Sequence, residues 1–375
     1  MSGLNKKIWI LVGTRPEVIK QVPVYEACVR RFGLENVAFV GTGQHRELLV
    51  QALDYFGHKL DENFDLMTPT QTLPGISAKV LERVGKAFEQ DKPEWIVVQG
   101  DTTSAAMAAW AAFQSGVKVL HNEAGLRSYD LQHPYPEEAN RRLISVVAQV
   151  HCVPTAKAKQ ALLSEGTRSD QIHITGNPGI DALRMALERK PSRELETLRA
   201  KVPTERLVLM TAHRRENRGD AVDQWFRGLR EFLDAREDLS LIYPMHPNEM
   251  AREAFKKHLE SSDRAILATP LPYGDTVHLL KSASWVVTDS GGIQEEATTL
   301  GMPVVVCRKT TERMEAVESG WSRLAGTETS GIMDAMAWAD QRARELGGKK
   351  SWLPIFGDGH AADRIAALVS INSSV

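Results

Sequence analysis

Cysteine is scarce in this chain of 375 residues, and long hydrophobic runs are missing from it. The three cysteines, Cys28, Cys152 and Cys307, are widely spaced and form no CxxC pair, which argues against a disulfide framework and a structural zinc site. No apolar run reaches the roughly 18 residues of a membrane span, and the N-terminal run Ile8–Val12 is too short for a signal peptide. We therefore expect a reduced, cytoplasmic protein that does not contact a membrane.

An excess of basic residues is also absent. The chain has 46 lysines and arginines against 48 acidic residues, a formal net charge of -2. Nucleic-acid-binding proteins usually carry a basic stripe, so this balance gives no support for that class. The hydrophobic fraction of 42% is typical of a globular protein. Because the chain is too long for one typical core, we expect two domains.

Short apolar runs alternate with longer helical segments along the whole chain. Most of the runs are continuous, as in strands that are covered on both faces of a parallel sheet. The predicted strands are 8–12, 36–43, 95–100, 117–122, 150–155, 206–213, 239–246, 264–271, 284–290 and 302–308. This alternation, repeated twice, predicts an α/β fold of two Rossmann-like, doubly wound parallel-sheet domains.

The stretch ITGNPGIDAL (174–183) breaks the pattern with two glycines and a proline, and we expect the domain boundary there. The last segment, 357–371, predicts a helix that crosses back onto the first domain. The predicted domains are 1–176 plus 358–375, and 177–357. Ligands in such folds bind outside the carboxyl ends of strands, and with two domains also between them, so the residues that follow each strand are the candidates for a site.

The first strand is followed by GTRPEVIK (13–20). Pro16 suits the start of a helix, and a helix N-terminus together with Arg15 and Lys20 would meet an anion. An ordinary capped helix with surface cations explains this spacing equally well. The dinucleotide fingerprint GxGxxG is absent.

Carboxylates follow two further strands and open a helix. Asp101 and Glu123 each come after an apolar run, and Pro136 begins a helix with Glu137 and Glu138 in its first turn. Helix capping or the helix dipole explains each position taken alone. Three carboxylate sites that end at one edge favour general acid and base chemistry, because paired acids in a cleft can divide the two roles.

In the second half, the segment TAHRREN (211–217) brings His213 and several cations to the end of a strand. It is either a solvated loop or an anion clamp with a titratable histidine. Arg313 follows another strand, within RKTTERMEAVESG (308–320), and offers a further cation.

The segment TDSGGIQEEA (288–297) also follows an apolar run. Its Ser290, Gly291 and Gly292 would begin a helix whose backbone N–H groups can approach a phosphate. Glu296, one turn on, suits the hydroxyls of a ribose. Glu295 points about 100° away from Glu296 on a helix, so we expect it to have a structural role.

Ten motifs, in this order over nearly the whole chain, closely resemble those of the non-hydrolysing UDP-N-acetylglucosamine 2-epimerases: GTRPEVIK, GQHRELL, GDTTS, EAGLRS, PYPEEANRR, ITGN, HRREN, TDSGGIQEEA, TTERMEAVESG and GDGHAADRI. The resemblance implies a GT-B-like fold with the active site in the interdomain cleft. It also implies reversible conversion of UDP-GlcNAc to UDP-ManNAc for bacterial surface polysaccharide precursors. In this family UDP is eliminated across carbons 1 and 2, a 2-acetamidoglucal forms, and UDP adds back, without NAD or a metal. Members are typically homodimers, and many respond to a second, activating UDP-GlcNAc.

The resemblance assigns roles to individual residues. The implied catalytic residues are Asp101, Glu123, Glu137 and His213. The implied UDP-binding residues are Arg15, Lys20, Tyr273, Ser290, Gly291, Gly292, Glu296 and Arg313. The implied activator site comprises Gln44, Glu137, Arg214 and His246. No nucleic-acid partner is implied.

Some positions depart from the family pattern. Thr276 stands where a phenylalanine usually packs on the uracil, and Tyr273 is the candidate to replace it. Lys309 and Met314, close to Arg313, replace the usual Asp and Pro, which keeps open an epimerase of another UDP-2-acetamido sugar, such as a 2,3-diacetamido uronic acid. A hydrolysing epimerase, a GT-B glycosyltransferase and a UDP-sugar binding module without activity are the remaining alternatives. For the activator site, Glu47 and Thr70 stand where some regulated members have Gln and Arg.

Overall fold

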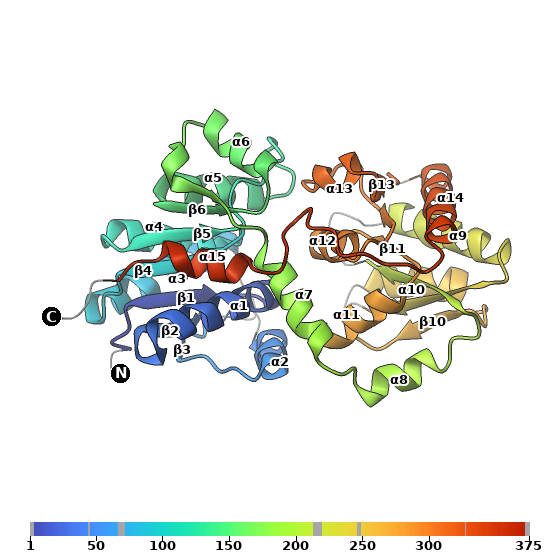
Figure 1. Ribbon diagram of the computed structural model, residues 1–375, viewed down its shortest axis with the longest axis horizontal. Coiled ribbons are helices and arrows are strands. Elements are labelled where there is room, and N and C mark those ends of the chain that lie inside the picture. The colour runs from blue at the N-terminus through green and yellow to red at the C-terminus, as the bar shows by residue number, and fades with distance from the viewer. Residues whose placement is uncertain are drawn as a thin grey trace. The chain divides into compact units, whose positions relative to one another are not determined.

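The structure is a computed structural model that describes residues 4–43, 46–66, 72–212, 220–245, 249–326 and 328–371. The chain divides into two compact units (Figure 1). The N-terminal unit comprises Met1–Arg184 and Phe356–Val375, and the C-terminal unit comprises Met185–Ile355.

The described strands of the N-terminal unit form a seven-stranded parallel sheet in the order β3-β2-β1-β4-β5-β6-β7. The strands are β1 (Ile8–Val12), β2 (Val37–Gly41), β3 (Glu62–Asn63), β4 (Trp95–Gln99), β5 (Lys118–Asn122), β6 (Val150–Val153) and β7 (Ile172–Ile174). All residues of β1, β2 and β4 are buried, because helices cover both faces of the sheet (Figure 1).

The helices of this unit are α1 (Arg15–Phe32), α2 (Arg46–Phe56), α3 (Leu73–Gln90), α4 (Thr103–Gln114), α5 (Glu137–Val147), α6 (Ala156–Ser164), α7 (Pro178–Glu188) and α15 (Ala361–Leu368). Helix α7 continues into the C-terminal unit. Two 3₁₀ turns lie at Leu34–Asn36 and Ser169–Gln171. Helix α4 begins at its N-cap Thr102, whose hydroxyl accepts a hydrogen bond from the Ala105 N–H at 3.0 Å. Six alanines of α4 are buried, and their small side chains let the helix lie close to its neighbours.

The described strands of the C-terminal unit form a six-stranded parallel sheet in the order β10-β9-β8-β11-β12-β13. The strands are β8 (Arg206–Thr211), β9 (Leu239–Pro244), β10 (Ala265–Ala268), β11 (Trp285–Thr288), β12 (Val304–Val306) and β13 (Ser322–Leu324). The helices are α8 (Arg193–Arg199), α9 (Asp220–Asp234), α10 (Glu249–Leu259), α11 (Tyr273–Ser282), α12 (Gly291–Thr299), α13 (Met314–Glu318) and α14 (Thr329–Leu346). Its core includes an edge-to-face contact of Phe232 with Trp285, with ring centroids 5.7 Å apart.

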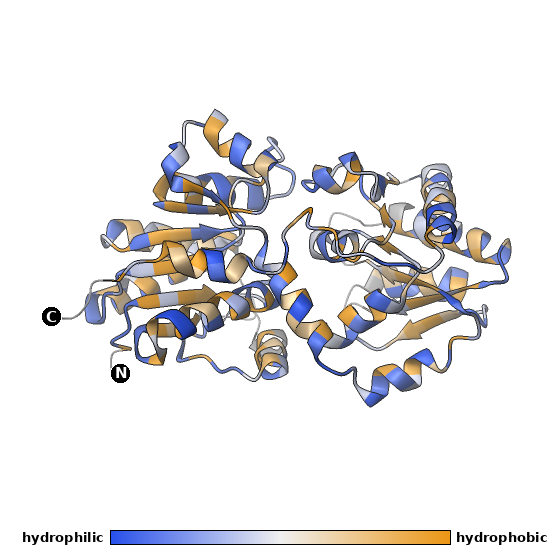
Figure 2. Cartoon of the chain, in the orientation of Figure 1, coloured by the Kyte–Doolittle hydropathy of each residue, from blue (hydrophilic) through white to orange (hydrophobic). Residues whose placement is uncertain are grey.

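The predicted α/β class with two doubly wound parallel sheets is confirmed. The ten predicted apolar runs all contain strands, and they colour as hydrophobic in both units (Figure 2). Both sheets have the strand order 3-2-1-4-5-6 of Rossmann-like folds, counted along each unit, and the N-terminal sheet adds β7 as a seventh strand. The order reverses between β1 and β4 and again between β8 and β11, and ligands bind at such switch points.

The C-terminal helix α15 packs on α1 of the N-terminal unit, as Figure 1 shows at the red end of the chain. Arg30 of α1 donates to Asp363 at 2.7 Å. The Asp181 carboxylate caps α15, because it accepts the Ala361 and Ala362 N–H groups at 3.1 and 2.9 Å. Burial raises the pKa of Asp181 to about 6 despite these donors. None of the helices within the described ranges is long and apolar enough to cross a membrane.

Candidate active site

In the N-terminal unit, a buried carboxylate joins the loops that follow β1 and β4. Glu17 accepts the Gly13 and Thr14 N–H groups at 2.9 and 2.7 Å, and its other oxygen accepts the Thr102 hydroxyl at 2.7 Å. Burial raises its pKa above the ordinary value. A Cβ at Gly13 would lie 2.5 Å from the Thr42 hydroxyl oxygen, so this loop needs glycine for close packing. The Thr-x-x-Glu capping box is the sequence signal that could have identified Glu17.

The two cations of this loop region lie on α1. Arg15 is the first residue of the helix and is half-buried. The Lys20 ammonium forms an ion pair with the Glu123 carboxylate, so the structure brings together two residues that the sequence predicts for the site.

Glu123 follows β5 and has a left-handed backbone with φ 59°. Such a conformation costs a non-glycine residue about 1–2 kcal/mol, and strained residues cluster at functional sites. Its carboxylate is almost fully buried and accepts hydrogen bonds from Lys20 and from the Gln99 amide at the end of β4. The neighbouring strands β4 and β5 thus bring the Glu123 side chain next to the start of the Asp101 loop.

Asp101 lies at the carboxyl end of β4, and its side chain is 31% exposed. Its Oδ2 accepts a hydrogen bond from Arg141 Nη1 at 2.6 Å. The preceding carbonyl, that of Gly100, lies 2.7 Å from His121 Nε2. Because a carbonyl only accepts, this nitrogen carries the proton, and burial lowers the pKa of His121 to about 3, which keeps the ring neutral.

The adjacent acids Glu137 and Glu138 in the first turn of α5 differ in burial. Glu138 is fully buried and accepts the Ser128 N–H at 3.0 Å and Arg141 Nη2 at 2.9 Å. Burial by itself raises the pKa of Glu138, but these donors together with Arg142 outweigh it and lower the pKa. Glu137 is half-buried. Sequence spacing did not separate these two acids, whereas the structure gives Glu138 an anchoring role.

In the C-terminal unit, α12 begins at Gly291 with Ser290 as its N-cap. The Ser290 hydroxyl oxygen accepts a hydrogen bond from the Ile293 N–H at 3.5 Å. The first N–H groups of a helix have no acceptor within the helix, so this turn suits an anion, as the glycine pair predicts.

The Arg313 guanidinium packs against this turn. A Cβ on Gly291 would lie 2.7 Å from Arg313 Cζ, so only glycine leaves room for it. Arg313 Nε donates to Glu295 Oε1 at 2.9 Å. The loop before it is tied to α12 by the Thr311 hydroxyl, which donates to Gln294 Oε1 at 2.8 Å. Sequence reasoning missed Gln294 and Thr311, and gave Glu295 a structural role without naming its partner.

Glu296 is also oriented by a neighbour. The Tyr273 hydroxyl donates to Glu296 Oε1 at 3.0 Å. Tyr273 is only 7% exposed, so its ring leaves little area on which a uracil could stack. The hydroxyl contact is therefore the better-supported role of this residue. Thr276, at the position of the usual phenylalanine, donates to the Pro272 carbonyl at 3.0 Å.

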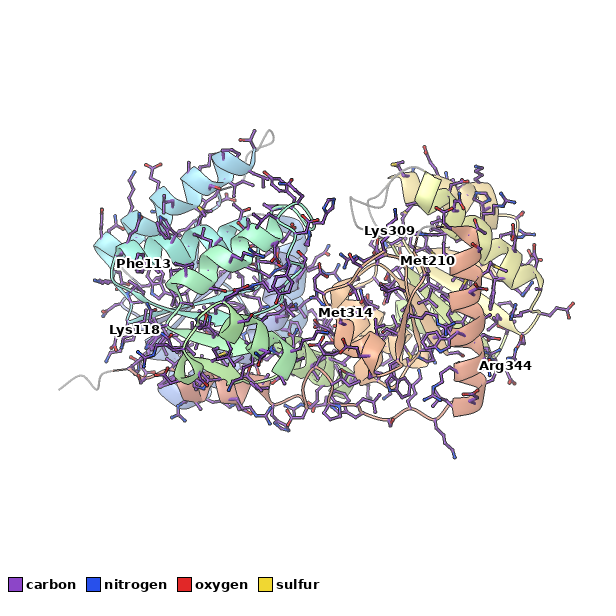
Figure 3. All side chains as sticks on the ribbon, turned by 90° about the horizontal axis from the view of Figure 1, so that it is seen from above. Phe113, Lys118, Met210, Lys309, Met314 and Arg344 are labelled. Carbon is purple, nitrogen blue, oxygen red and sulfur yellow. The ribbon has the colours of Figure 1, made fainter. Side chains whose placement is uncertain are left out.

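Two residues beside Arg313, Lys309 and Met314, depart from the family pattern. Lys309 is exposed, and Met314 is the first residue of α13; Figure 3 shows both in the C-terminal unit. Arg313 is the N-cap of α13 and forms an ion pair with Glu295.

Four predicted residues lie outside the described residues: Gln44, His213, Arg214 and His246. Thr70 lies outside them as well. In the part of the chain that the structure describes, no group of three His, Cys, Asp or Glu side chains is arranged to hold a metal ion.

Comparisons with known proteins agree on one family. The sequence profile of the family described as UDP-N-acetylglucosamine 2-epimerase matches residues 29–370. The UDP-N-acetylglucosamine 2-epimerase of Bacillus subtilis (strain 168) is 38% identical over 359 residues, which cover 96% of this chain and 93% of that protein.

Solved structures agree as well. The S. aureus MnaA–UDP co-structure has a TM-score of 0.87 at 38% identity and covers 96% of this chain and 95% of its own. The UDP-GlcNAc 2-epimerase of Neisseria meningitidis bound to UDP-GlcNAc has a TM-score of 0.87 at 36% identity, with 96% and 98% covered. The chain belongs to the UDP-N-acetylglucosamine 2-epimerase family.

Proposed function

We propose that the protein interconverts UDP-GlcNAc and UDP-ManNAc by epimerisation at carbon 2 of the sugar. The observation that carries this proposal is the set of carboxylates Asp101, Glu123 and Glu137 in a chain of this epimerase family. The first two follow the neighbouring strands β4 and β5, and the third opens α5, whose Arg141 binds Asp101.

The chemistry requires more than one acid or base. A carboxylate removes the proton from carbon 2 while the bond from carbon 1 to the UDP oxygen breaks, which gives UDP and a 2-acetamidoglucal. A proton is then delivered to carbon 2 on the opposite face, and UDP adds back at carbon 1. Asp101, Glu123 and Glu137 supply and accept these protons, and His213 is a further proton donor beside the diphosphate.

The C-terminal unit binds UDP in this proposal. The first turn of α12, with Ser290, Gly291 and Gly292, and the Arg313 guanidinium bind the diphosphate, and Glu296 accepts the ribose hydroxyls. Cations that neutralise the diphosphate make UDP a better leaving group. From the N-terminal unit, Arg15 contributes to the diphosphate, and Lys20 holds Glu123 in place.

The reaction involves no net oxidation, since the proton lost at carbon 2 is regained there. The proposed route moves a proton rather than a hydride at carbon 2, so it has no step for NAD, and cations of the chain rather than a metal ion neutralise the diphosphate. A cytoplasmic location, a homodimer and a second UDP-GlcNAc as activator belong to the same proposal. Phe113 of α4 (Figure 3) and Val146 of α5 are exposed apolar side chains on contacting helices, and we propose these two helices as the surface of that dimer. Of the four activator residues, Glu137 is the one with a described side chain.

The test is incubation with UDP-GlcNAc in heavy water, with the products followed by NMR. We expect deuterium at carbon 2 and formation of UDP-ManNAc. Free ManNAc would indicate a hydrolysing enzyme, and transfer that needs an added acceptor would indicate a glycosyltransferase. Exchange only with a UDP-2,3-diacetamido uronic acid would change the substrate, not the reaction.

The matched variant is Asp101→Asn, which keeps the size of the side chain but replaces the carboxylate, which can accept a proton, with an amide, which cannot. We expect loss of exchange by a factor of about 10² or more, because general base catalysis contributes that much. UDP affinity should be unchanged, since the residues proposed to bind UDP remain. Epimerisation at a near-normal rate would remove Asp101 from the mechanism.

A further inference from the structure

Arg141 lies on α5, one helical turn after Glu137, and its side chain is only 2% exposed. We infer that Arg141 is a positioning residue for the epimerisation, which holds the Asp101 carboxylate ionised and in one orientation. The inference rests on the proposed function, because it acts through the role of Asp101 as a catalytic group.

The guanidinium bridges two carboxylates with different surroundings. Its Nη1 donates to Asp101 Oδ2 at 2.6 Å, and its Nη2 and Nε donate to Glu138 Oε2 at 2.9 and 3.2 Å. A guanidinium is planar and always charged, so the contact with Glu138 fixes the direction in which Nη1 points. Asp101 is partly exposed, whereas Glu138 is fully buried. Glu138 is thus the anchor, and Asp101 is the group that is oriented.

The anchor is itself fixed to the loop that precedes α5. Glu138 accepts the Ser128 N–H at 3.0 Å and the Tyr129 N–H at 3.3 Å. Arg141 therefore connects the backbone at Ser128 and Tyr129, through Glu138, to Asp101. Disturbance of this loop would move the Asp101 carboxylate without touching it.

The same helix also holds the main chain of Asp101. Asn140 Nδ2 donates to the Asp101 carbonyl at 2.9 Å. Consecutive residues of α5 thus fix both the backbone and the side chain of Asp101. Because α5 begins with Glu137, one helix sets the relative placement of two proposed catalytic carboxylates.

The charges near Asp101 come from three elements. Helix α5 contributes Arg141, Glu138 and Glu137; the end of β5 contributes Glu123; and α1 contributes Lys20, paired with Glu123, and Glu17, bound to Thr102. Without Arg141, these elements would hold four carboxylates together with Lys20, which is paired with Glu123, and Arg142, which is paired with Glu138. The Asp101 carboxyl would then protonate at a higher pH, because a nearby guanidinium favours the ionised form.

The experiment compares Arg141→Gln, Arg141→Lys and Arg142→Gln in the heavy-water exchange assay as a function of pH. For Arg141→Gln we expect exchange at pH 7 to fall about 100-fold, as misplacement of a reacting group does. The acid limb of its pH–rate profile should move up by about 1–3 pH units. Arg141→Lys keeps the positive charge but cannot bind Asp101 and Glu138 at the same time in the fixed geometry of a guanidinium. Its exchange rate should therefore fall, while the acid limb of its pH–rate profile should move less than that of Arg141→Gln.

Arg142→Gln is the matched control. Arg142 is 40% exposed and donates at 3.1 Å to Glu138 Oε1, not to the Oε2 that Arg141 binds, and its described ion pair is with Glu138 rather than with Asp101. We expect its rate and its profile to match those of the wild type. Added guanidinium should restore part of the exchange in Arg141→Ala and have no effect on Arg142→Gln. The affinity for UDP, measured by calorimetry, should be unchanged in every variant. This measurement serves as the control that each variant is folded.

Two results would overturn the inference: a wild-type pH profile for Arg141→Gln, or an equal loss of exchange in Arg141→Gln and Arg142→Gln. If Arg141→Gln loses UDP affinity and hence its fold, Arg141→Lys decides, and a wild-type rate for it contradicts the geometric role. A wild-type protein that shows no exchange at all contradicts the proposed function instead, and the inference about Arg141 falls with it.

Discussion

At the scale of single residues, the neighbours Glu295 and Glu296 illustrate how direction separates two identical side chains. Successive residues of a helix point about 100° apart. Glu295 accordingly pairs with Arg313, and Glu296 accepts the Tyr273 hydroxyl. The helical period predicts that the two acids face different surroundings, but the partners come from loops and helices that the period does not describe.

The Tyr273 hydroxyl gives a prediction at this scale. Tyr273→Phe removes its hydrogen bond to a carboxylate, and such bonds contribute about 1.5–3 kcal/mol. Without it, the Glu296 side chain is free to leave the orientation proposed for the ribose. We expect the Kd for UDP to rise about tenfold or more, measured by isothermal titration calorimetry.

A second substitution at the same position separates orientation from stacking. If the hydroxyl is what matters, Tyr273→Phe and Tyr273→Leu should weaken UDP binding to a similar extent. If the ring stacks on the uracil, Tyr273→Phe should retain the affinity and Tyr273→Leu should lose it. The double variant Tyr273→Phe/Glu296→Gln should cost less than the sum of the single changes, because the two groups act as one unit.

At the scale of elements, the start of α12 depends on the absence of a side chain at Gly291. An added Cβ would lie 2.7–3.0 Å from three atoms of the Arg313 guanidinium. The guanidinium cannot easily yield, because Glu295 and Glu312 hold it at 2.9 and 3.4 Å. The glycine thus serves the loop of Arg313 as much as the approach of a phosphate.

Gly291→Ala should therefore displace Arg313 and raise the Kd for UDP about tenfold or more, equivalent to about 1.4 kcal/mol. The control is Gly85→Ala in the interior of α3, where a Cβ would meet nothing within 4 Å. That change should leave UDP binding intact and stabilise the protein by about 0.5–1 kcal/mol, since alanine favours a helix. Wild-type UDP affinity in Gly291→Ala would contradict the proposed place of Arg313 in the site.

Elements also differ in how far the sequence predicts them. The continuous apolar runs identified every strand that is buried on both faces. The short edge strands β3, β7 and β13 were not predicted, because their sequences EN, IHI and SRL are not continuous apolar runs, unlike the equally short VVV of β12. The sequence Glu62–Asn63 of β3 has no apolar residue, and it is a strand only through its pairing with β2.

The candidate site was predictable at the level of residue types and not at the level of partners. Residues at strand ends, such as Asp101 and Glu123, follow from the apolar runs before them. The Lys20–Glu123 pair joins residues 103 positions apart, and the Arg141–Asp101 pair joins residues 40 apart. These contacts depend on the strand order β1-β4-β5 and on the packing of α5, which no local pattern encodes.

At the scale of the whole molecule, two buried histidines in the N-terminal sheet link stability to pH. His121 of β5 and His151 of β6 lie opposite each other in the strand register, and both are buried. Burial lowers the pKa of His121 to about 3 and that of His151 to about 4, from an ordinary value of 6.5. Below pH 6.5 the unfolded chain binds protons at these positions and the folded protein does not.

The free energy of unfolding should therefore fall as the pH is lowered from 6.5 towards 4. Between pH 6.5 and 5, each histidine accounts for a loss on the order of 2 kcal/mol. Two buried carboxyl groups oppose this loss near pH 5, because their raised pKa values make the folded protein the better proton acceptor there. Asp181, with a pKa of about 6, does so by on the order of 1 kcal/mol, and Glu17 acts in the same direction. Urea unfolding at pH 7 and pH 5 measures the net loss, which we expect to be on the order of 3 kcal/mol.

The histidine variants assign this loss to its source. His151→Gln should destabilise the protein at both pH values, since it introduces an amide into a buried site. The difference between pH 7 and pH 5 should nevertheless shrink by on the order of 2 kcal/mol, because one titrating group is gone. The same holds for His121→Gln. His133→Gln is the control. Because the His133 side chain is exposed, this substitution should leave the difference in unfolding free energy between pH 7 and pH 5 unchanged. An unaltered difference in both buried-site variants would mean that other groups govern the acid sensitivity of the fold.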